Sequence, residues 1–118
     1  MLTREEVMAY VLNKYDVQLE YMWKKYPSFA VLRHAQNRKW FGLVMNVEEA
    51  QLGLDGHGAE EIIDVKLDPK EVEFRQGTKG FLPAYHMNKN HWIAIRLGQF
   101  DSKAICDLID ESYQMTEK

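Results

Sequence analysis

Hydrophobic and polar positions alternate through the middle of the chain, which is the pattern of β-strands. Residues 39–47 predict such a strand, because apolar side chains recur at every second position and make one face the more apolar. The recurring side chains are Phe41, Leu43, Met45 and Val47. The strands predicted from runs of this kind are residues 29–34, 39–47, 62–67, 81–86 and 91–97.

Helix signals lie at both ends of the chain and once between the strands. Thr3 can accept a hydrogen bond from the first helical turn while Glu6 reaches back to the Thr3 backbone, which is a capping box. Asp68 and Pro69 suit the start of another helix, since aspartate caps the first turn and proline has the required backbone angle. The helices predicted are residues 4–14, residues 69–76 and a C-terminal helix that begins at Asp101 or Ser102.

The order of these elements predicts an α+β fold. Polar turns at residues 36–38 and 87–90 join neighbouring strands over short distances, so these strands are expected to pair antiparallel as hairpins. The N- and C-terminal helices would then pack on one face of the antiparallel sheet, which gives a two-layer sandwich. With 118 residues, 46% of them hydrophobic, the chain can form one core, and residues 1–118 are expected to be a single domain.

The compartment is indicated by cysteine usage and by the start of the chain. The single cysteine, Cys106, excludes a disulfide within the chain and suits a reducing environment. The first residues are charged where a signal peptide needs an apolar core. No apolar run approaches the roughly 20 residues of a membrane-spanning helix. These observations predict a cytoplasmic protein without a membrane partner, and they do not indicate its oligomeric state.

Basic residues are concentrated in two acid-free parts of the chain, although the formal net charge is -3. Residues 21–47 carry five basic residues and residues 74–100 carry four, whereas residues 48–73 carry nine acids and two lysines. Such blocks either form basic patches that attract a nucleic-acid backbone or belong to an ordinary mixed surface that segregates along the sequence. The sequence pattern leaves both interpretations open.

Candidate catalytic and metal-binding groups are sparse. His86 and His91 are five residues apart and His34 is a candidate third ligand, but the surrounding stretch has no carboxylate or cysteine to complete a zinc site. Cys106 lies among apolar residues of the last helix, where a buried structural thiol is expected. No phosphate-binding loop or GxSxG nucleophile motif occurs. We therefore expect a non-enzymatic protein with no metal, no cofactor and no catalytic residue.

The predicted hairpin turns carry side chains suited to an anion. Arg38 and Lys39 provide positive charge at the first turn, and Lys89 provides it at the second. Asparagines beside them can add directional hydrogen bonds to phosphate oxygens. The alternative is that these asparagines serve only the geometry of the turns and that the nearby Trp40 and Trp92 pack in the core.

Several longer stretches resemble the MmcQ/YjbR family. They are RHAQNRKWFGLVMNV, the Leu-Gly-Leu within residues 51–55, DVKLDP, and GFLPAYHMNKNHWIAI followed by DLIDESYQMT. The resemblance extends from about Tyr21 to Thr116, and PAYHMNKNHW is its most distinctive string. It implies a sandwich related to the frataxin (CyaY)-like fold and a DNA-binding function through a double-wing motif, which consists of two β-hairpin wings.

Carried over by position, the resemblance places the wings at the two predicted hairpin turns. Frataxins bind iron through acids crowded along the first helix. Here that helix offers Glu5 and Glu6 and then no acid until Asp16, so iron handling is not expected to carry over. DNA binding of this kind is expected to weaken steeply with salt. The residues expected to contact DNA are Arg33, Asn37, Arg38, Lys39, Lys79, Asn88, Lys89 and Asn90.

Two alternatives to DNA binding stay open. One is a small-ligand or anion-binding protein, which a concave arrangement of the histidines would favour. The other is a protein-interaction module, which an exposed apolar patch would favour. The residues expected to line a ligand pocket are Tyr85, His86, Lys89 and His91, with His34 as a further candidate.

Overall fold

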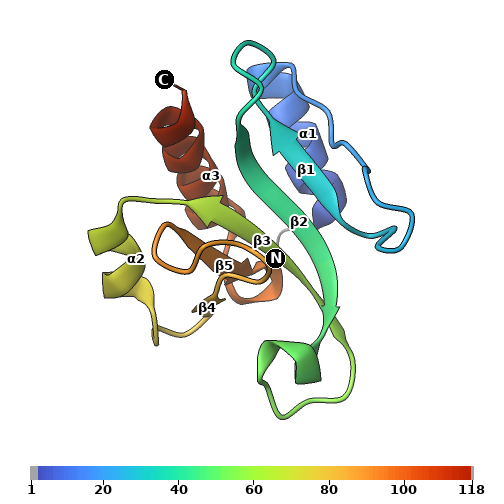
Figure 1. The fold of residues 1–118 in the computed structure, drawn as a ribbon, viewed down its shortest axis with the longest axis vertical. Helices are drawn as coiled ribbons and strands as arrows, with labels where there is room; N and C mark the ends of the chain where they lie inside the picture. The colour runs from blue at the N-terminus through green and yellow to red at the C-terminus, as the bar shows by residue number, and fades with distance from the viewer. Residues whose placement is uncertain (1–2, 118) are drawn as a thin grey trace.

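A five-stranded antiparallel sheet forms the centre of the protein in the computed structural model, which describes residues 3–117 (Figure 1). The strands lie in the order β1-β2-β3-β5-β4, so β4 is an edge strand and β5 inserts between β3 and β4. All neighbouring strands in this order pair antiparallel. The strands are β1 (Ala30–Arg33), β2 (Trp40–Glu48), β3 (Ala59–Lys66), β4 (Phe81–Pro83) and β5 (Trp92–Arg96).

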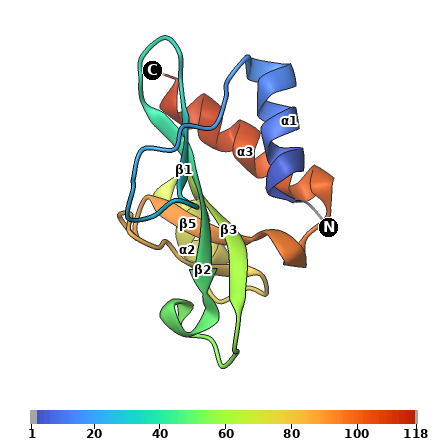
Figure 2. The same ribbon diagram turned by 90° about the vertical axis from the view of Figure 1, so that its right-hand side faces the viewer.

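Helices α1 and α3 cover one face of the sheet (Figure 2). The capping box at the start of α1 is present, since Thr3 and Glu6 each bond to the other's backbone N–H. The prediction of an α+β fold with terminal helices over an antiparallel sheet is therefore confirmed.

Within the described residues, no helix is long and apolar enough to cross a membrane. The helices are α1 (Arg4–Tyr15), α2 (Pro69–Arg75) and α3 (Ser102–Thr116), with short 3-10 helices η1 (Glu49–Leu52) and η2 (Leu97–Gln99).

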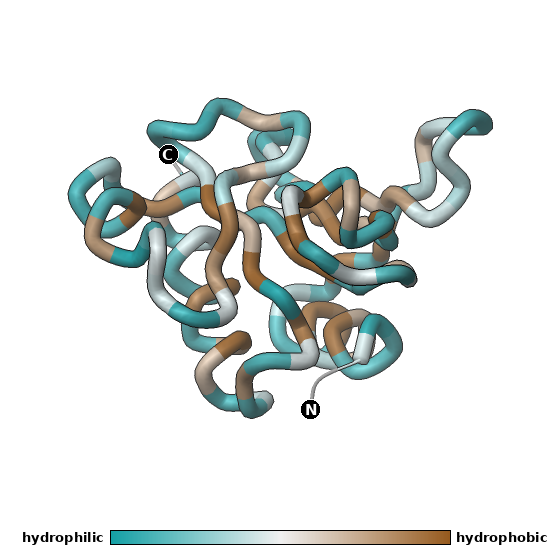
Figure 3. Tube along the Cα trace, turned by 90° about the horizontal axis from the view of Figure 1, so that it is seen from below, coloured by the Kyte–Doolittle hydropathy of each residue, from teal (hydrophilic) through white to brown (hydrophobic). Residues whose placement is uncertain are grey.

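Both faces of the sheet bury apolar side chains. On the helix side, Val7 and Val11 of α1 and Ile105 and Ile109 of α3 are fully buried against the strands. The opposite face forms a second buried cluster that is covered by segments 20–29 and 84–91 rather than by α1 and α3. Hydrophobic stretches accordingly lie in the strands at the centre, and hydrophilic stretches lie mainly in the surrounding loops (Figure 3).

A β-bulge in β2 interrupts its pairing with β1. Leu32 pairs with Gly42 and Arg33 pairs with Trp40, so Phe41 is an extra residue without a partner on β1. An extra residue reverses the alternation of side chains beyond it, because strand side chains change face at every residue. Gly42 also lacks the room for a side chain, since a Cβ atom there would lie 2.6 Å from the Leu32 side chain.

The bulge exchanges the faces of two large aromatic residues. Phe41 lies on the helix side, where its ring centroid is 6.0 Å from that of Tyr15 and 4.9 Å from that of Tyr113. The prediction that Phe41 shares the face of Leu43 is therefore wrong, because the alternation does not continue through the bulge. Trp40 is directed instead to the face opposite the helices.

The strand predicted over residues 81–86 is too long. β4 ends at Pro83, which lacks the N–H that would continue the ladder of hydrogen bonds. His86 has a φ of 65°, a left-handed angle that a strand residue does not adopt. Residues 84–91 form a loop instead. The bounds of the other predicted helices and strands agree with the observed ones to within three residues.

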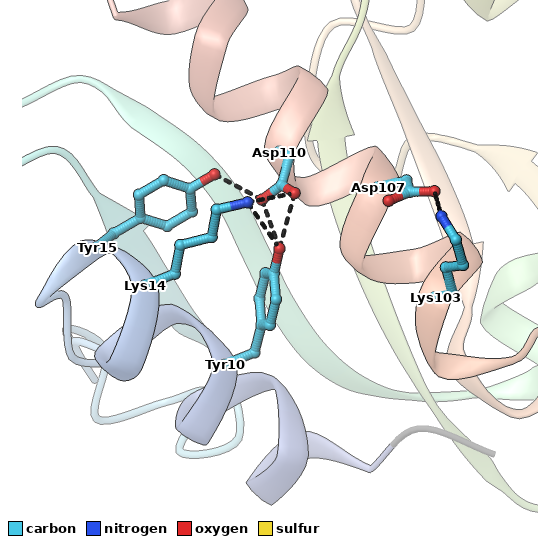
Figure 4. A network of polar contacts seen from close by, with 6 residues as sticks. All are labelled: Tyr10, Lys14, Tyr15, Lys103, Asp107 and Asp110. Carbon is cyan, nitrogen blue, oxygen red and sulfur yellow. Dashed lines mark hydrogen bonds and ion pairs between the residues drawn. The ribbon is translucent and has the colours of Figure 1, made fainter.

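A cluster of polar side chains joins α1 to α3 (Figure 4). The carboxylate of Asp110 on α3 accepts hydrogen bonds from three side chains in the second half of α1. These are the hydroxyls of Tyr10 and Tyr15 and the ammonium group of Lys14. Burial alone would raise the pKa of Asp110, but the three hydrogen bonds hold it below its ordinary value. Because its carboxylate is fully engaged, we regard the cluster as a structural junction.

Candidate functional site

The face of the sheet opposite α1 and α3 contains a cavity of about 340 Å³ with mainly aromatic walls. Its lining residues come from β2, from the segment that follows α1 and from the loop that joins β4 to β5. Figure 2 shows the segment that follows α1 on the side of the sheet away from α1 and α3. This volume suits a small organic molecule. The lining residues are Trp23, Tyr26, Phe29, Trp40, Leu43, His86 and Met87.

The first wall of the cavity comes from residues 23–29. The N–H of Phe29 donates to the carbonyl of Tyr26 at 3.0 Å, which closes a turn around Pro27. This turn stacks the two rings of Tyr26 and Phe29, with their centroids 4.8 Å apart. The Trp23 ring meets Phe29 edge-on at 6.2 Å. The turn thus brings the three rings together into one aromatic surface.

Trp40 continues this wall from β2. Its ring lies 5.9 Å from that of Trp23 in an edge-on arrangement, and the bulge at Phe41 gives it that orientation. The guanidinium group of Arg33 lies over the Trp40 ring, 5.9 Å from its centroid, and also donates to Glu20 at 3.2 Å. A cation over a tryptophan ring is a favourable contact that holds the ring in place.

The second wall is the loop 84–91. His86 lines the cavity, and its ring centroid is 6.0 Å from that of Phe29 and 6.3 Å from that of Tyr26. A left-handed backbone angle at a residue other than glycine costs about 1 kcal/mol or more, and these ring contacts offset part of that cost. Within the loop, the ammonium group of Lys89 donates to the carbonyl of Ala84 at 2.9 Å. The loop is therefore folded back on itself rather than extended as a hairpin tip.

A buried carboxyl group lies beside the floor of the cavity. Asp64 is in the middle of β3, paired with Leu43 on one side and Ala94 on the other, and it is 0% exposed. Directly paired residues of an antiparallel sheet have side chains on the same face, so Asp64 is next to the lining residue Leu43. No well-formed hydrogen bond reaches either carboxylate oxygen of Asp64 in the described part of the chain, although the backbone N–H of Tyr85 faces the carboxyl group.

The protonation of Asp64 reflects this environment. Burial raises its pKa to about 8, and the backbone N–H of Tyr85 and the positive charge of Lys89 only partly counter that effect. The carboxyl group is therefore largely protonated at neutral pH. A buried polar group without partners calls for an explanation, and a carboxyl group with a strongly raised pKa near a cavity is a candidate functional group.

The structure separates the residues predicted for a ligand pocket. His86 lines the cavity, and Tyr85 packs beside it with a ring distance of 4.0 Å. Lys89 contributes its charge to Asp64 but is not part of the lining. His91 is exposed and lies outside the lining as well. Of the residues predicted for a ligand pocket, His86 is thus the one in the lining, and ligand binding by them stays a prediction.

His34 belongs to a different part of the molecule from the cavity. It is buried on the helix side, where its Nε2 atom lies 2.7 Å from the hydroxyl of Thr116 and its ring lies 4.2 Å from that of Tyr113. Burial lowers the pKa of His34, so the neutral ring is favoured. The prediction that His34 joins the other histidines is wrong, because β1 directs it to the opposite face.

The residues predicted to contact DNA lie in three places. Those of the first turn follow β1, those of the second turn precede β5, and both turns are at the same end of the sheet. Lys79 precedes β4 and is at the other end, so it is not brought together with them. Arg33 is engaged with Glu20 and Trp40 as described.

Two asparagines of these turns stabilise the fold. Asn37 donates to the carbonyls of Thr116 and Glu117, at 2.9 and 3.1 Å, which ties the first turn to the end of α3. The side chain of Asn88 accepts from the backbone of Asn90 at 2.8 Å, which shapes the second turn. Arg38 is exposed at the tip of the first turn with a left-handed φ of 66°.

Other hollows of the surface are weaker candidates for a functional site. One of about 310 Å³ lies between α2 and α3 and includes the exposed carboxylates of Asp68, Glu71 and Glu111. Within residues 3–117, no group of three or more His, Cys, Asp or Glu side chains is placed to hold a metal ion.

Sequence reasoning missed most of the cavity. Trp23, Tyr26 and Phe29 are unremarkable along the chain, because nothing local indicates that this segment folds over the sheet. Asp64 did carry a signal, since it is a lone acid within the apolar run IIDVKL of a strand. Such an acid in a central strand is rare without a partner or a function.

Comparisons with known proteins identify relatives across the whole chain. The family model described as YjbR matches residues 12–115. The chain is 44% identical over 118 residues to the uncharacterized protein YyaQ of Bacillus subtilis (strain 168), covering 99% of this chain and 100% of that protein. A shorter match of 55 residues, 40% identical and covering 45% of each chain, is to the uncharacterized protein YbdF of Escherichia coli O157:H7.

Solved structures with the same fold include a crystal structure of a protein from Pseudomonas syringae. It is 37% identical, with a TM-score of 0.93 over 98% of this chain and 99% of that one. The crystal structure of the Deinococcus radiodurans protein DR2400 gives a TM-score of 0.72 over 100% of this chain and 80% of that one. Its identity of 20% indicates a likeness of fold alone.

Proposed function

The chain belongs to the YjbR family, and from its geometry we propose that it is a binding protein whose aromatic cavity takes a small planar ring compound. One observation carries this proposal. Four aromatic side chains and a histidine, from segments far apart in the sequence, converge around one cavity on the face that α1 and α3 leave open. Flat walls of this kind bind planar rings by stacking and edge-on contacts.

We propose binding rather than catalysis for this site. Apart from His86, the lining side chains are aromatic or aliphatic. Within residues 3–117, the His86 ring contacts other rings and no acid that would orient it as a general base. We also propose that the fold is related to that of frataxin and that the protein is cytoplasmic.

Tyr26 provides a test of the cavity with little risk to the fold, because its side chain is 47% exposed. We expect Tyr26→Ala to weaken binding of planar rings such as guanosine or quinazolin-4-one about 2- to 10-fold, through loss of one aromatic contact. Isothermal titration calorimetry measures this, with cyclohexanecarboxamide as a non-planar compound that should bind worse.

Tyr21→Ala is the matched control, since Tyr21 is 52% exposed on the same segment but does not line the cavity. It should leave the affinity unchanged. Absence of binding by planar rings, or equal effects of the two substitutions, would contradict the cavity as a binding site.

A second candidate function is binding to duplex DNA through the two turns. The observation in its favour is that both acid-free turns lie at the same end of the sheet, about three strand spacings or roughly 14 Å apart. Acids of α2 border the second turn, since Glu73 shares a hollow with Lys89 and Asn90. The geometry therefore supports the cavity more strongly than the turns.

Charge reversal tests the DNA proposal. Replacing Arg38, Lys39 and Lys89 with glutamate is expected to abolish binding to a labelled duplex while changing the thermal transition little, because the changes remove phosphate contacts. Fluorescence anisotropy across a salt series measures binding. A control variant in which the exposed Lys70 and Lys103 are replaced with glutamate should still bind the duplex. Unaltered binding by the triple variant would exclude the two turns as the contact.

A further inference from the structure

Asp64 stands out among the polar groups of the protein. Neither of its carboxylate oxygens accepts a well-formed hydrogen bond, although the Tyr85 N–H faces them. The remaining unpartnered buried side-chain atom among the described residues is Nε of Arg4. Arg4 still forms an ion pair with Glu61 at 2.8 Å, so its charge is compensated. Asp64 has no comparable partner, although it lies in the same sheet face as the cavity and next to the lining residue Leu43.

We propose that Asp64 selects the ligand of the cavity, and that this ligand is a neutral planar heterocycle with a ring N–H and an adjacent amino group. These two donors would bond in parallel to the two carboxylate oxygens, as 2-amino-pyrimidinone rings such as guanine allow. The inference rests on the proposed function, because the ring must first enter the aromatic cavity.

The surroundings of the cavity favour a neutral ring over a cation. Amidines and guanidines also offer paired N–H donors, but they carry a positive charge. Residues 21–47, which supply five of the seven lining residues, hold five basic residues and no acid. Arg33 already occupies one face of Trp40. The positive charge of Arg33, 5.9 Å from the centroid of the Trp40 ring, opposes a cationic ligand stacked on that ring.

A ligand can reach the carboxyl group of Asp64 only if the loop 84–91 moves. Asp64 is not part of the cavity lining, and the loop supplies the groups that face it, namely the Tyr85 N–H and Lys89. Met87 belongs to the wall and to the apolar cluster of this face, and its unbranched side chain repacks readily. His86 holds a left-handed backbone angle within this loop, which is a conformation of raised energy.

Protonation gives this site a pH signature. The charged or titratable group that faces Asp64 is Lys89 of the loop, while its strand neighbours Leu43 and Ala94 are uncharged. Two N–H donors bind the ionised carboxylate, so ligand binding must release the proton that Asp64 holds below about pH 8. Affinity should therefore rise between about pH 6 and pH 8 by roughly tenfold or more.

Guanosine and inosine provide the test, because they differ only by the amino group on the ring. Wild-type protein should prefer guanosine by about tenfold or more, since inosine leaves one carboxylate oxygen unpaired. Asp64→Asn should bind both nucleosides with affinities within about twofold and should lose the pH dependence. Asp107→Asn, at an exposed site on α3, should behave like wild type.

The outcomes separate this inference from the proposed function. If neither nucleoside nor any other planar ring binds, the proposed function fails. If both nucleosides bind wild-type protein equally, or if Asp64→Asn keeps the preference for guanosine, the inference is overturned while the cavity stands. A short single-stranded oligonucleotide with one guanine, compared with guanosine, distinguishes a nucleic-acid source of the ring from a free heterocycle.

Discussion

Replacing Asp64 with asparagine is expected to stabilise the protein against unfolding at alkaline pH. Burial raises the pKa of Asp64 from an ordinary value of 3.8 to about 8 in the folded protein. The unfolded chain therefore releases this proton near pH 4, whereas the folded chain holds it until about pH 8. The contribution of Asp64 to the free energy of unfolding is fully present below the lower value and is lost as the pH rises through this window.

The Asp64→Asn variant has no titrating group at this position, so its stability should not show this loss. Relative to wild type, its free energy of unfolding should increase by roughly 2–5 kcal/mol between about pH 4 and pH 8. Urea unfolding at a series of pH values measures the difference, in which the contributions of other titrating groups cancel.

Asp107→Asn is the control for this experiment, because Asp107 is exposed and only forms an ion pair with Lys103 one turn away. Its effect should stay below about 0.5 kcal/mol over the same pH range. If the difference between Asp64→Asn and wild type were independent of pH, burial would not raise the pKa of Asp64 in the folded protein.

Replacing Ser112 with alanine is expected to lower the free energy of unfolding by about 2–4 kcal/mol. Ser112 on α3 is fully buried; its hydroxyl donates to the carbonyl of Phe41 at 2.6 Å and accepts from the N–H of Lys66 at 2.8 Å. Continuing the β2–β3 register past Leu43 and Asp64 places Phe41 opposite Lys66. The hydroxyl thus replaces a direct bond between the strands, and alanine leaves two backbone groups unpaired beside the bulge.

Ser28→Ala is the matched control. The hydroxyl of Ser28 also bridges backbone groups, donating to the carbonyl of Asn46 at 3.3 Å and accepting from its N–H at 3.2 Å, but this pair is exposed. Water can replace the lost bonds there, so the cost should be below about 1 kcal/mol. Chemical denaturation compares the two variants. Equal losses at the two sites would contradict the bridging role of Ser112.

The helices and strands were predictable because each is encoded by a local pattern. Capping residues such as Thr3 and Asp68 mark helix starts, and both caps are observed. The register within β2 was not predictable, because a bulge depends on the pairing with β1 and leaves no mark in the alternation of apolar residues. The observed placement of Trp40 on the open face follows from that pairing.

The candidate site was less predictable than the fold. Its lining comes from three segments that meet only in the folded protein, and the loop 84–91 folds back through the contacts of Lys89 and His86 rather than projecting as a hairpin tip. The sequence pointed to the cations and histidines of this loop as candidate ligand contacts, because residues of these types are recognised without knowledge of the fold. The groups that shape the cavity are aromatic residues that sequence reasoning assigns to a core, and Trp40 is one of them.

Chemical-shift mapping tests the aromatic cavity most directly. Titration of ¹⁵N-labelled protein with guanosine is expected to shift the indole N–H signals of Trp23 and Trp40 and the backbone amide of His86, because these groups line the cavity. Amides of α1 and α3, on the opposite side of the sheet, should stay in place. Absence of shifts at Trp23 and Trp40 with guanosine and with the other planar rings, or shifts confined to the helices, would contradict the proposed binding site.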